Sequence, residues 1–347
     1  MEPIVKWYGG LENNLEMLQG MLPHQFENYY EPFLGGGAMY MSMVGKSCHV
    51  NDKCPELMNI YKLIGKDDGR TVNFFSTIAA AWKKMEAHFL GVVDDLSEIN
   101  ERNRLGLYRD YRNFVAQVNE IVDRVNYRNI FYRVMPDPPD FKMQLRHCVI
   151  YEMLRMEKLF DIEDKDIERN LLFAMKLAIY DFLMEVVNRE EAEEPVRAAA
   201  LAFILNYCTD MPFKRDEWGQ IRFPFGPREK AEESLAKKVK MLKSDELKGH
   251  FAKTGFHCCD ALEFLHVYKP KENDFIFLDP PAEVKKEAGE MDFSPIQHRQ
   301  LATFLLRTPA KWMLLVQRNC TALPRYREAG MKVSRIKGFD KLIIRNY

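Results

Sequence analysis

An aspartate followed by two prolines stands directly after a short apolar run of the sequence. The run is FIFL at 275–278, and it leads into Asp279, Pro280 and Pro281. Such a run is typical of a strand buried on both faces, and open α/β sheets bind ligands at the carboxyl edge where Asp279 would lie. Proline has no N–H group. The Asp279 carboxylate and the Pro280 carbonyl would therefore face outward together as a pair of acceptors.

Two acceptors placed on one amino group have a chemical use. They orient the nitrogen and increase its lone-pair character, so that a poor nucleophile can attack an electrophilic methyl carbon. The plainer alternative is that Asp279 caps a turn and does no chemistry.

A glycine-rich turn near the N-terminus could hold the ligand that supplies such a methyl group. Residues 29–40, YYEPFLGGGAMY, run from a strand signal through three glycines into a helical pattern. Glycines let backbone N–H groups approach a ligand at the positive end of a helix, although three glycines are also common in a simple tight turn. A second strand signal ends at Asp52, whose carboxylate could accept hydrogen bonds from ribose hydroxyls or cap the helix that opens at Pro55.

Two α/β segments flank a helical one, and they must bring these groups together. Residues 1–71 read as strand, turn, helix, strand and helix, which implies a parallel sheet. Strand and helix signals return over 251–347. Residues 72–250 carry long amphipathic helical patterns, the first of them from Phe74 to Phe89, and a β-hairpin signal at 211–225. The sequence therefore predicts an α/β catalytic domain, formed by 1–71 and 251–347, that is interrupted by a mostly helical domain over 72–250.

Composition excludes several classes of protein. Hydrophobic residues make up 47% and charged residues 29% of 347, with 18 Gly and 17 Pro, which is typical of a globular chain and not of a disordered, collagenous or coiled-coil one. The chain lacks a run of 18 apolar residues and a signal-peptide pattern, so we expect no membrane association and a cytoplasmic location. Its seven cysteines have no CxxC spacing, which favours reduced thiols and no metal site.

The net charge of −1 hides an uneven distribution. Residues 311–347 carry 9 Lys and Arg against 2 Asp and Glu, whereas residues 161–194 carry 4 against 11. Basic segments permit a nucleic-acid-binding face, although charge runs are more often solvated helix faces.

Eight short motifs occur in an order that resembles the Dam-like (D12 class) adenine-N6 DNA methyltransferases. They are KWYGG at 6–10, YYEPFLGGGAMY at 29–40, NDKCPELMNIY at 51–61, RAAALAFILN at 197–206, RFPFG at 222–226, CDALEFL at 259–265, FLDPP at 277–281 and LIIRNY at 342–347. The helices between about 72 and 195 match only loosely and are longer than the family leads us to expect.

The resemblance implies a Rossmann-like S-adenosylmethionine-dependent methyltransferase sheet with a target-recognition domain between the cofactor and catalytic motifs. It implies that Asp279 and Pro280 grip the target amino group, beside Pro281 and Ala282. Asp52 would hold the cofactor ribose and Asp260 its adenine edge. The other cofactor contacts that it implies are Lys6, Trp7, Glu31, Pro32, Phe33, Gly35 and Gly37.

Double-stranded DNA is the partner that the resemblance implies. A stacked adenine cannot present its amino group to a buried methyl donor, so such enzymes extrude the base from the duplex. Residues of the hairpin would meet the DNA, or they could be simple surface groups. They are Lys214, Arg215, Trp218 and Arg222.

Three places depart from the family pattern, one of them in the hairpin, where Thr209-Asp210 replaces the expected Asn-Gly pair. Ala282 stands where an aromatic residue normally stacks on the extruded base, a contact worth roughly 1–3 kcal/mol, and Leu11 stands where a lysine is usual. Ala282 could be an engineered change, or another aromatic such as Phe293 or Trp218 could provide the platform, or the chain could bind without methylating. Leu11 is an independent departure and favours divergence.

Three functions therefore stay open at this point. The first is an adenine-N6 DNA methyltransferase, whose setting could be restriction-modification, phage or regulatory methylation. The second is a catalytically silent module that binds DNA or a partner. The third is a methyltransferase for RNA, a protein amide or a small molecule. The helical insertion could enlarge the DNA footprint or dock a protein partner.

Overall fold

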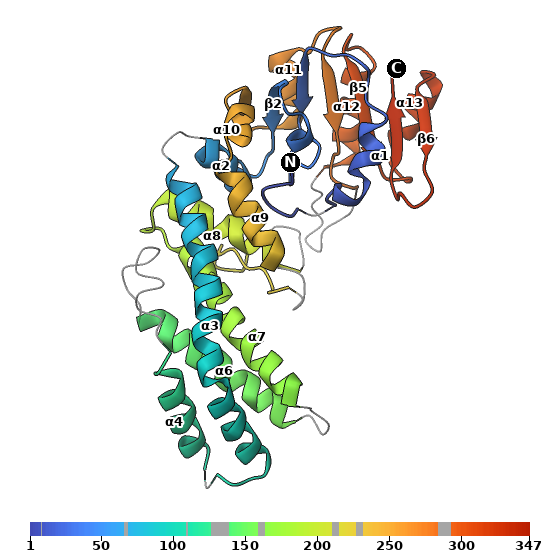
Figure 1. The fold of residues 1–347 in the computed structure, drawn as a ribbon. Coiled ribbons are helices and arrows are strands. Elements are labelled where there is room, and N and C mark those ends of the chain that lie inside the picture. The colour runs from blue at the N-terminus through green and yellow to red at the C-terminus, as the bar shows by residue number, and fades with distance from the viewer. Residues whose placement is uncertain are drawn as a thin grey trace. The chain divides into compact units, whose positions relative to one another are not determined.

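The computed structural model divides the chain into two compact units (Figure 1). One consists of Met1–Lys66 and Met241–Tyr347, and the other of Asp67–Lys240. The structure describes residues 1–7, 9–65, 69–108, 110–125, 139–158, 164–209, 215–226, 232–283 and 293–347. The helical unit thus begins five residues before and ends ten residues before the limits predicted for the insertion, 72–250.

A seven-stranded sheet forms the centre of the first unit, in the order β3-β2-β1-β4-β5-β7-β6. All neighbouring pairs are parallel except those made by β7, which is antiparallel to both β5 and β6. This confirms the predicted Rossmann-like α/β sheet. The strands are β1 (Asn28–Glu31), β2 (Ser47–Asn51), β3 (Thr254–His257), β4 (Phe275–Leu278), β5 (Lys311–Val316), β6 (Lys332–Arg335) and β7 (Leu342–Arg345).

The order of the strands reverses between β1 and β4. From β1 the chain proceeds outward to β2 on one side, whereas β4 and β5 lie on the other side. Tyr30 lies opposite Ile276 in the β1–β4 ladder, so the segments that follow the two strands leave the same edge of the sheet. Such a switch point is where open α/β sheets bind ligands. The glycine turn follows β1 and Asp279 follows β4.

Helices cover the sheet, and the alternation of side chains explains how. Ile276 and Leu278 of β4 share one buried cluster with residues of three helices, α11, α12 and α13. Successive strand residues point to opposite faces of a sheet. Phe275 and Phe277, which are also fully buried, therefore lie on the other face. The helices of this unit are α1 (Leu15–Gln19), α2 (Pro55–Gly65), α10 (Asp245–Phe251), α11 (Ala261–Tyr268), α12 (Pro295–Leu305) and α13 (Leu323–Glu328).

The helix predicted directly after the glycine turn is wrong in type. Tyr40–Ser42 form a short 3₁₀ helix, η2, and a second one, η1, spans Glu12–Asn14. Ser42 and Met43 each donate a backbone hydrogen bond to the residue three positions earlier, which is the 3₁₀ pattern. The chain must enter β2 at Ser47, which leaves no room for further turns.

The second unit is helical. Its long helix α3 was expected to span Phe74 to Phe89, but it runs from Arg70 to Arg104, because Val92, Leu96 and Ile99 continue the buried face beyond Gly91. No helix in the described part of the chain is long and apolar enough to cross a membrane. The other helices are α4 (Tyr111–Val122), α6 (Pro139–Glu157), α7 (Asp164–Asn188), α8 (Glu194–Tyr207) and α9 (Glu232–Leu242), the last of which reaches into the first unit.

The predicted hairpin takes the form of isolated antiparallel bridges. Arg215 pairs with Ile221 and Cys208 with Phe225, while residues 210–214 lie outside the described part. The second arm is fixed to α7, since Asn188 exchanges hydrogen bonds of 2.7 and 3.0 Å with the backbone of Ile221. The hairpin is therefore held on the helical unit.

Candidate active site

Asp279 lies at the carboxyl end of β4 and is held by a lysine. Its side chain is 15% exposed, and both of its oxygens accept hydrogen bonds from Nζ of Lys341, at 2.5 and 2.7 Å. Burial raises the pKa of Asp279, and the ammonium of Lys341 opposes the shift. The carboxyl group thus lies at the carboxyl edge of the sheet, as the apolar run predicts, whereas no sequence pattern indicated Lys341 as its partner.

The residues that follow Asp279 differ in their exposure to solvent. Pro280 is buried, Pro281 is exposed and Ala282 is half-buried. The next residue, Glu283, is anchored: its Oε1 accepts hydrogen bonds from the backbone N–H of Thr321 at 2.9 Å and from its hydroxyl at 3.0 Å. This contact fixes the end of the Asp-Pro-Pro-Ala segment to the loop after β5.

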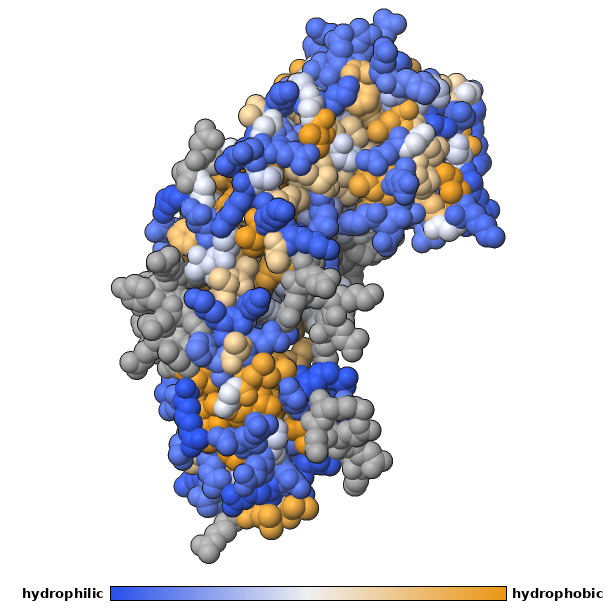
Figure 2. All heavy atoms as spheres, viewed as in Figure 1, coloured by the Kyte–Doolittle hydropathy of each residue, from blue (hydrophilic) through white to orange (hydrophobic). Residues whose placement is uncertain are grey.

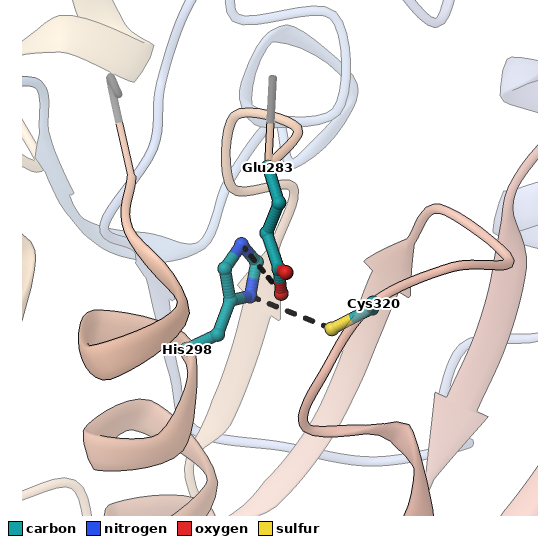
Figure 3. A group of neighbouring side chains, drawn as sticks. All are labelled: Glu283, His298 and Cys320. Carbon is teal, nitrogen blue, oxygen red and sulfur yellow. Dashed lines mark hydrogen bonds and ion pairs between the residues drawn. The ribbon is translucent and has the colours of Figure 1, made fainter. Parts of the chain in front are cut away.

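A buried imidazole lies beside that anchor, as Figure 3 shows. Nδ1 of His298 lies 3.7 Å from Sγ of Cys320, and Nε2 lies 3.9 Å from Oε1 of Glu283. Burial lowers the pKa of His298 and raises that of Cys320 to about 11, so a neutral ring faces a protonated thiol at neutral pH.

These three side chains are a group that could hold a metal ion, with ligand atoms within 4.8 Å of one another. The two ring nitrogens of His298 face different partners, however, and one metal ion can take only one of them. At 3.9 Å, Nε2 is too far from Oε1 of Glu283 for a hydrogen bond, so the ring contacts the Cys320 thiol and packs beside Glu283 without bonding to it. This arrangement suits side-chain packing better than it suits a metal centre. The expectation of no metal site stays a prediction.

The glycine turn after β1 is needed for packing within the protein. Gly37 has φ +69°, and a Cβ atom there would lie 2.8 Å from the hydroxyl of Tyr61, which itself donates to the carbonyl of Gly36. Gly35 has φ +50°, and its Cβ would lie 2.8 Å from Cδ1 of Trp7. Positive φ values favour glycine. Trp7 and Gly35, predicted separately as cofactor contacts, are therefore neighbours.

Asp52 closes the turn from the adjacent strand. One of its oxygens accepts from the N–H of Gly35 at 2.9 Å and the other from the N–H of Cys54 at 3.0 Å. Burial raises the pKa of Asp52, and these hydrogen bonds oppose the shift. Asp52 thus orients the glycine turn and the backbone that leads into α2, and each carboxylate oxygen still has a second lone pair for a ligand.

Asn51 is a site residue that the sequence analysis missed. Its fully buried amide donates to the carbonyls of Pro32 and Cys259, each at 3.1 Å, and accepts from the N–H of Cys259 at 3.0 Å. It thereby ties the loop after β1 to the loop after β3. Asn51 directly precedes Asp52 in the sequence, and only the charged Asp52 was predicted to be a site residue.

Asp260 caps α11 with one oxygen and leaves the other available. Its Oδ1 accepts from the N–H groups of Leu262 and Glu263, while its Oδ2 accepts no hydrogen bond from the described residues. Lys6 is exposed, and Phe33 is half-buried. Asp260 and Phe33 lie on the loops after β3 and β1, at the carboxyl ends of these strands, as cofactor contacts would. Lys6 lies in the N-terminal segment before β1.

Glu31 and its neighbours make this edge of the sheet acidic. The carboxyl group of Glu31 is buried and accepts from the hydroxyl of Tyr29 at 2.7 Å. Burial raises the pKa of Glu31, the Tyr29 hydrogen bond opposes the shift, and the charges of Asp279 and Asp52 raise it further. Carboxyl oxygens thus lie at the ends of β1, β2 and β4, and the charge of Asp279 is paired with Lys341. These hydrogen-bond acceptors fit a cofactor that contains a ribose and an adenine.

Phe293 is not free to stack on a base in this conformation. It is 2% exposed, and its ring makes edge contacts with Phe33 at 5.2 Å and with His298 at 4.7 Å between centroids. Phe293 instead connects the cofactor turn to the Glu283 anchor.

The predicted DNA contacts lie in the helical unit. Trp218 is 75% exposed at the tip of the hairpin, where Asp216 accepts from its N–H at 3.0 Å. Arg215 donates to the carbonyl of Gly219, and Arg222 donates to Asp216. Lys214 lies outside the described residues. Both arginines thus shape the turn while staying exposed to solvent.

The surface of the helical unit also carries apolar side chains. Figure 2 shows them at the end of this unit where α3 leads into α4, and Leu105 and Leu107 there are 66% and 60% exposed. A protein partner for this unit stays a prediction.

Two comparisons with known proteins bear on the site. The sequence model of the family described as "D12 class N6 adenine-specific DNA methyltransferase" matches residues 7–314. The chain is also 25% identical over 126 residues to a protein named Type II methyltransferase M1.LlaDCHI from Lactococcus lactis subsp. cremoris. The aligned region covers 31% of this chain and 44% of that relative. The match thus spans less than half of the relative.

Proposed function

Since the chain belongs to the D12 class N6 adenine-specific DNA methyltransferase family, we propose that it transfers a methyl group from S-adenosylmethionine to N6 of an adenine extruded from double-stranded DNA. The observation that carries the proposal is the position of Asp279. Its buried carboxyl group ends β4 at the switch point, at the edge where the glycine turn ends β1. A poor nucleophile and its methyl donor would meet there.

The chain's own groups have separate roles in this reaction. S-adenosylmethionine, when bound, supplies a methyl carbon on a sulfonium sulfur that retains the bonding electrons as the adenine nitrogen forms the new C–N bond. Asp279 accepts a hydrogen bond from the amino group, together with the Pro280 carbonyl, and takes the proton that the alkylated nitrogen loses. The proton then passes to water. Geometry fixed before the reaction lowers the barrier without reorganisation.

The cofactor would be held by the loops after β1, β2 and β3. Trp7 and Gly35 form one wall, and Asp52 is placed to meet the ribose. The unpaired Oδ2 of Asp260 could accept from an adenine amino group. Lys6, Glu31, Pro32, Phe33 and Gly37 complete the proposed contacts.

Recognition of DNA is assigned to the helical unit. Trp218, Arg215 and Arg222 are exposed on the hairpin, where an aromatic ring and two cations suit a base and phosphates. Lys214 is proposed for the same face. Ala282 provides no aromatic surface for the extruded adenine, which favours a second candidate, a module that binds cofactor and DNA without methylating.

The test is methylation of plasmid DNA free of N6-methyladenine, read as N6-methyladenosine by mass spectrometry of digested nucleosides. The proposal predicts N6-methyladenine with the unaltered chain or, if stacking is limiting, with Ala282→Tyr. Asp279→Ala should abolish transfer while calorimetry shows nearly unchanged affinity for S-adenosylmethionine. Cofactor and DNA binding with no transfer by the unaltered chain or Ala282→Tyr would support the silent module instead.

A further inference from the structure

Lys341 reaches the active site because of the direction of β7. Val316 pairs with Leu342, so the amino end of β7 lies at the carboxyl end of β5. β5 in turn neighbours β4, with Leu278 opposite Leu314. Only an antiparallel strand can place the residue before it at the edge where parallel strands end. Lys341 therefore lies beside Asp279, although it comes from the connection between β6 and β7.

The Lys341 ammonium is enclosed by the carboxylate and the N-terminal loop. Its two hydrogen bonds go to the two oxygens of Asp279, and the two side chains are 18% and 15% exposed. Nζ would lie 3.7 Å from a Cβ atom built on Gly9, so it also sits against the loop that carries Lys6 and Trp7. In a surface ion pair, the ammonium group would be neither largely buried nor packed against a second loop.

We propose that Lys341 is a positioning residue for methyl transfer, which holds the Asp279 carboxylate anionic and correctly turned and releases one oxygen to the incoming amino group. This inference rests on the proposed function. A carboxylate has about four acceptor positions, and the ammonium uses two, so an amino N–H can be received with a small displacement.

The need for a cation follows from the surroundings of Asp279. Burial raises its pKa, and among the described groups the Lys341 ammonium is the one that opposes the shift. Glu31 is a second acidic group that interacts with Asp279, whose charge raises the pKa of Glu31. Without the ammonium, Asp279 would bind a proton more readily. A protonated carboxyl could then neither accept from the amino group on both oxygens nor take up its proton.

Replacement of the lysine by a residue of similar length tests the charge. In Lys341→Met we expect kcat at pH 7 to fall at least about tenfold, with the acid limb of the kcat profile shifted upward by roughly one to three pH units. Lys341→Arg should keep the limb near its original position. The KM for S-adenosylmethionine should change by less than about threefold in both, since the proposed role lies at the reacting amine. The control is Lys337→Met, which alters an exposed lysine of the same connection.

Two results would overturn the proposal. One is a Lys341→Met profile that overlays the original or shows faster transfer, since the lysine would then be idle or inhibitory. The other is an equal loss in the Met and Arg variants at every pH, which would indicate a structural role only.

A readout without turnover separates this proposal from the proposed function. The side-chain carboxyl of Asp279 can be titrated by ¹³C NMR in protein labelled at aspartate, with Asp279→Asn used for assignment. The Lys341→Met variant should titrate at higher pH than the unaltered chain even if neither methylates DNA. Equal midpoints would refute the role of Lys341 and leave the proposed function standing.

Discussion

Asn51 offers the sharpest test of how the site is built, because one amide joins two cofactor loops. Three N–H···O hydrogen bonds of its side chain, two at 3.1 Å and one at 3.0 Å, connect Pro32 on one loop with Cys259 on the other, in a fully buried position. The Cys259 thiol also donates to its Oδ1 at 3.4 Å. Each such bond contributes about 1 kcal/mol net, and a buried partner left unpaired adds to the loss. Asn51→Ala should therefore reduce the free energy of unfolding by about 3 kcal/mol.

The assay is urea unfolding together with calorimetric binding of S-adenosylmethionine. Because the two loops carry Phe33 and Asp260, we expect Asn51→Ala to weaken cofactor affinity at least roughly tenfold, or about 1.4 kcal/mol. Asn59→Ala, on the partly exposed side of α2, is the matched control and should change stability by no more than about 0.5 kcal/mol. A loss below about 1 kcal/mol in Asn51→Ala with unchanged affinity would refute the reasoning.

Asn51→Asp adds a pH dependence with a defined sign. An aspartate keeps the acceptor for the Cys259 N–H but turns an oxygen toward the two carbonyls, so its folded pKa should lie above the unfolded value of about 3.9. A raised folded pKa means that the folded variant binds protons more tightly than the unfolded one. Its stability relative to the unaltered chain should fall as pH rises from about 4 toward 7. A deficit that is flat in this range would contradict the hydrogen-bond assignment.

Three further predictions concern the turn, the hairpin and the thiols. Both Gly37 and Gly45 have positive φ, at +69° and +84°, but a Cβ atom would collide with Tyr61 only at Gly37. Gly37→Ala should therefore lower the thermal unfolding midpoint more than Gly45→Ala, and equal losses would contradict this steric argument. Trp218→Ala should leave stability unchanged while weakening DNA binding by about 1–3 kcal/mol, measured by fluorescence anisotropy against Val267→Ala, another exposed apolar change; unaltered affinity would remove Trp218 from the interface. Maleimide at pH 7 should label exposed Cys258 well before Cys320, since burial raises the Cys320 pKa to about 11; comparable rates, read by peptide mass spectrometry, would show that the anchor is open.

The sequence allowed prediction of the parts of the site that are local in the chain. The apolar run before Asp279 predicts β4, and the glycines after β1 are explained by positive φ and close contacts. The predicted end of this helix at Phe89 was wrong, since α3 continues through Gly91 to Arg104. The helix interior tolerates Gly91 at a cost of about 1 kcal/mol, while buried residues on both sides hold the helix.

The remaining parts depend on contacts between distant segments. Lys341 lies in the basic C-terminal region, but its pairing with Asp279 follows only from the antiparallel course of β7. His298 and Cys320 come from α12 and the loop after β5, and no spacing in the sequence links them to Glu283. The roles of Asn51 and Lys341 could therefore not be predicted from residue type and spacing.

A crystal structure of the protein with S-adenosylhomocysteine and an oligonucleotide that carries its target adenine would test the proposed chemistry most directly. We expect the cofactor sulfur to face Asp279 from the turn at Gly35, with the extruded adenine N6 within hydrogen-bonding distance of the Asp279 carboxylate and the Pro280 carbonyl. A cofactor bound elsewhere, or an Asp279 that stays fully paired with Lys341 while the adenine lies away from it, would contradict the proposed reaction.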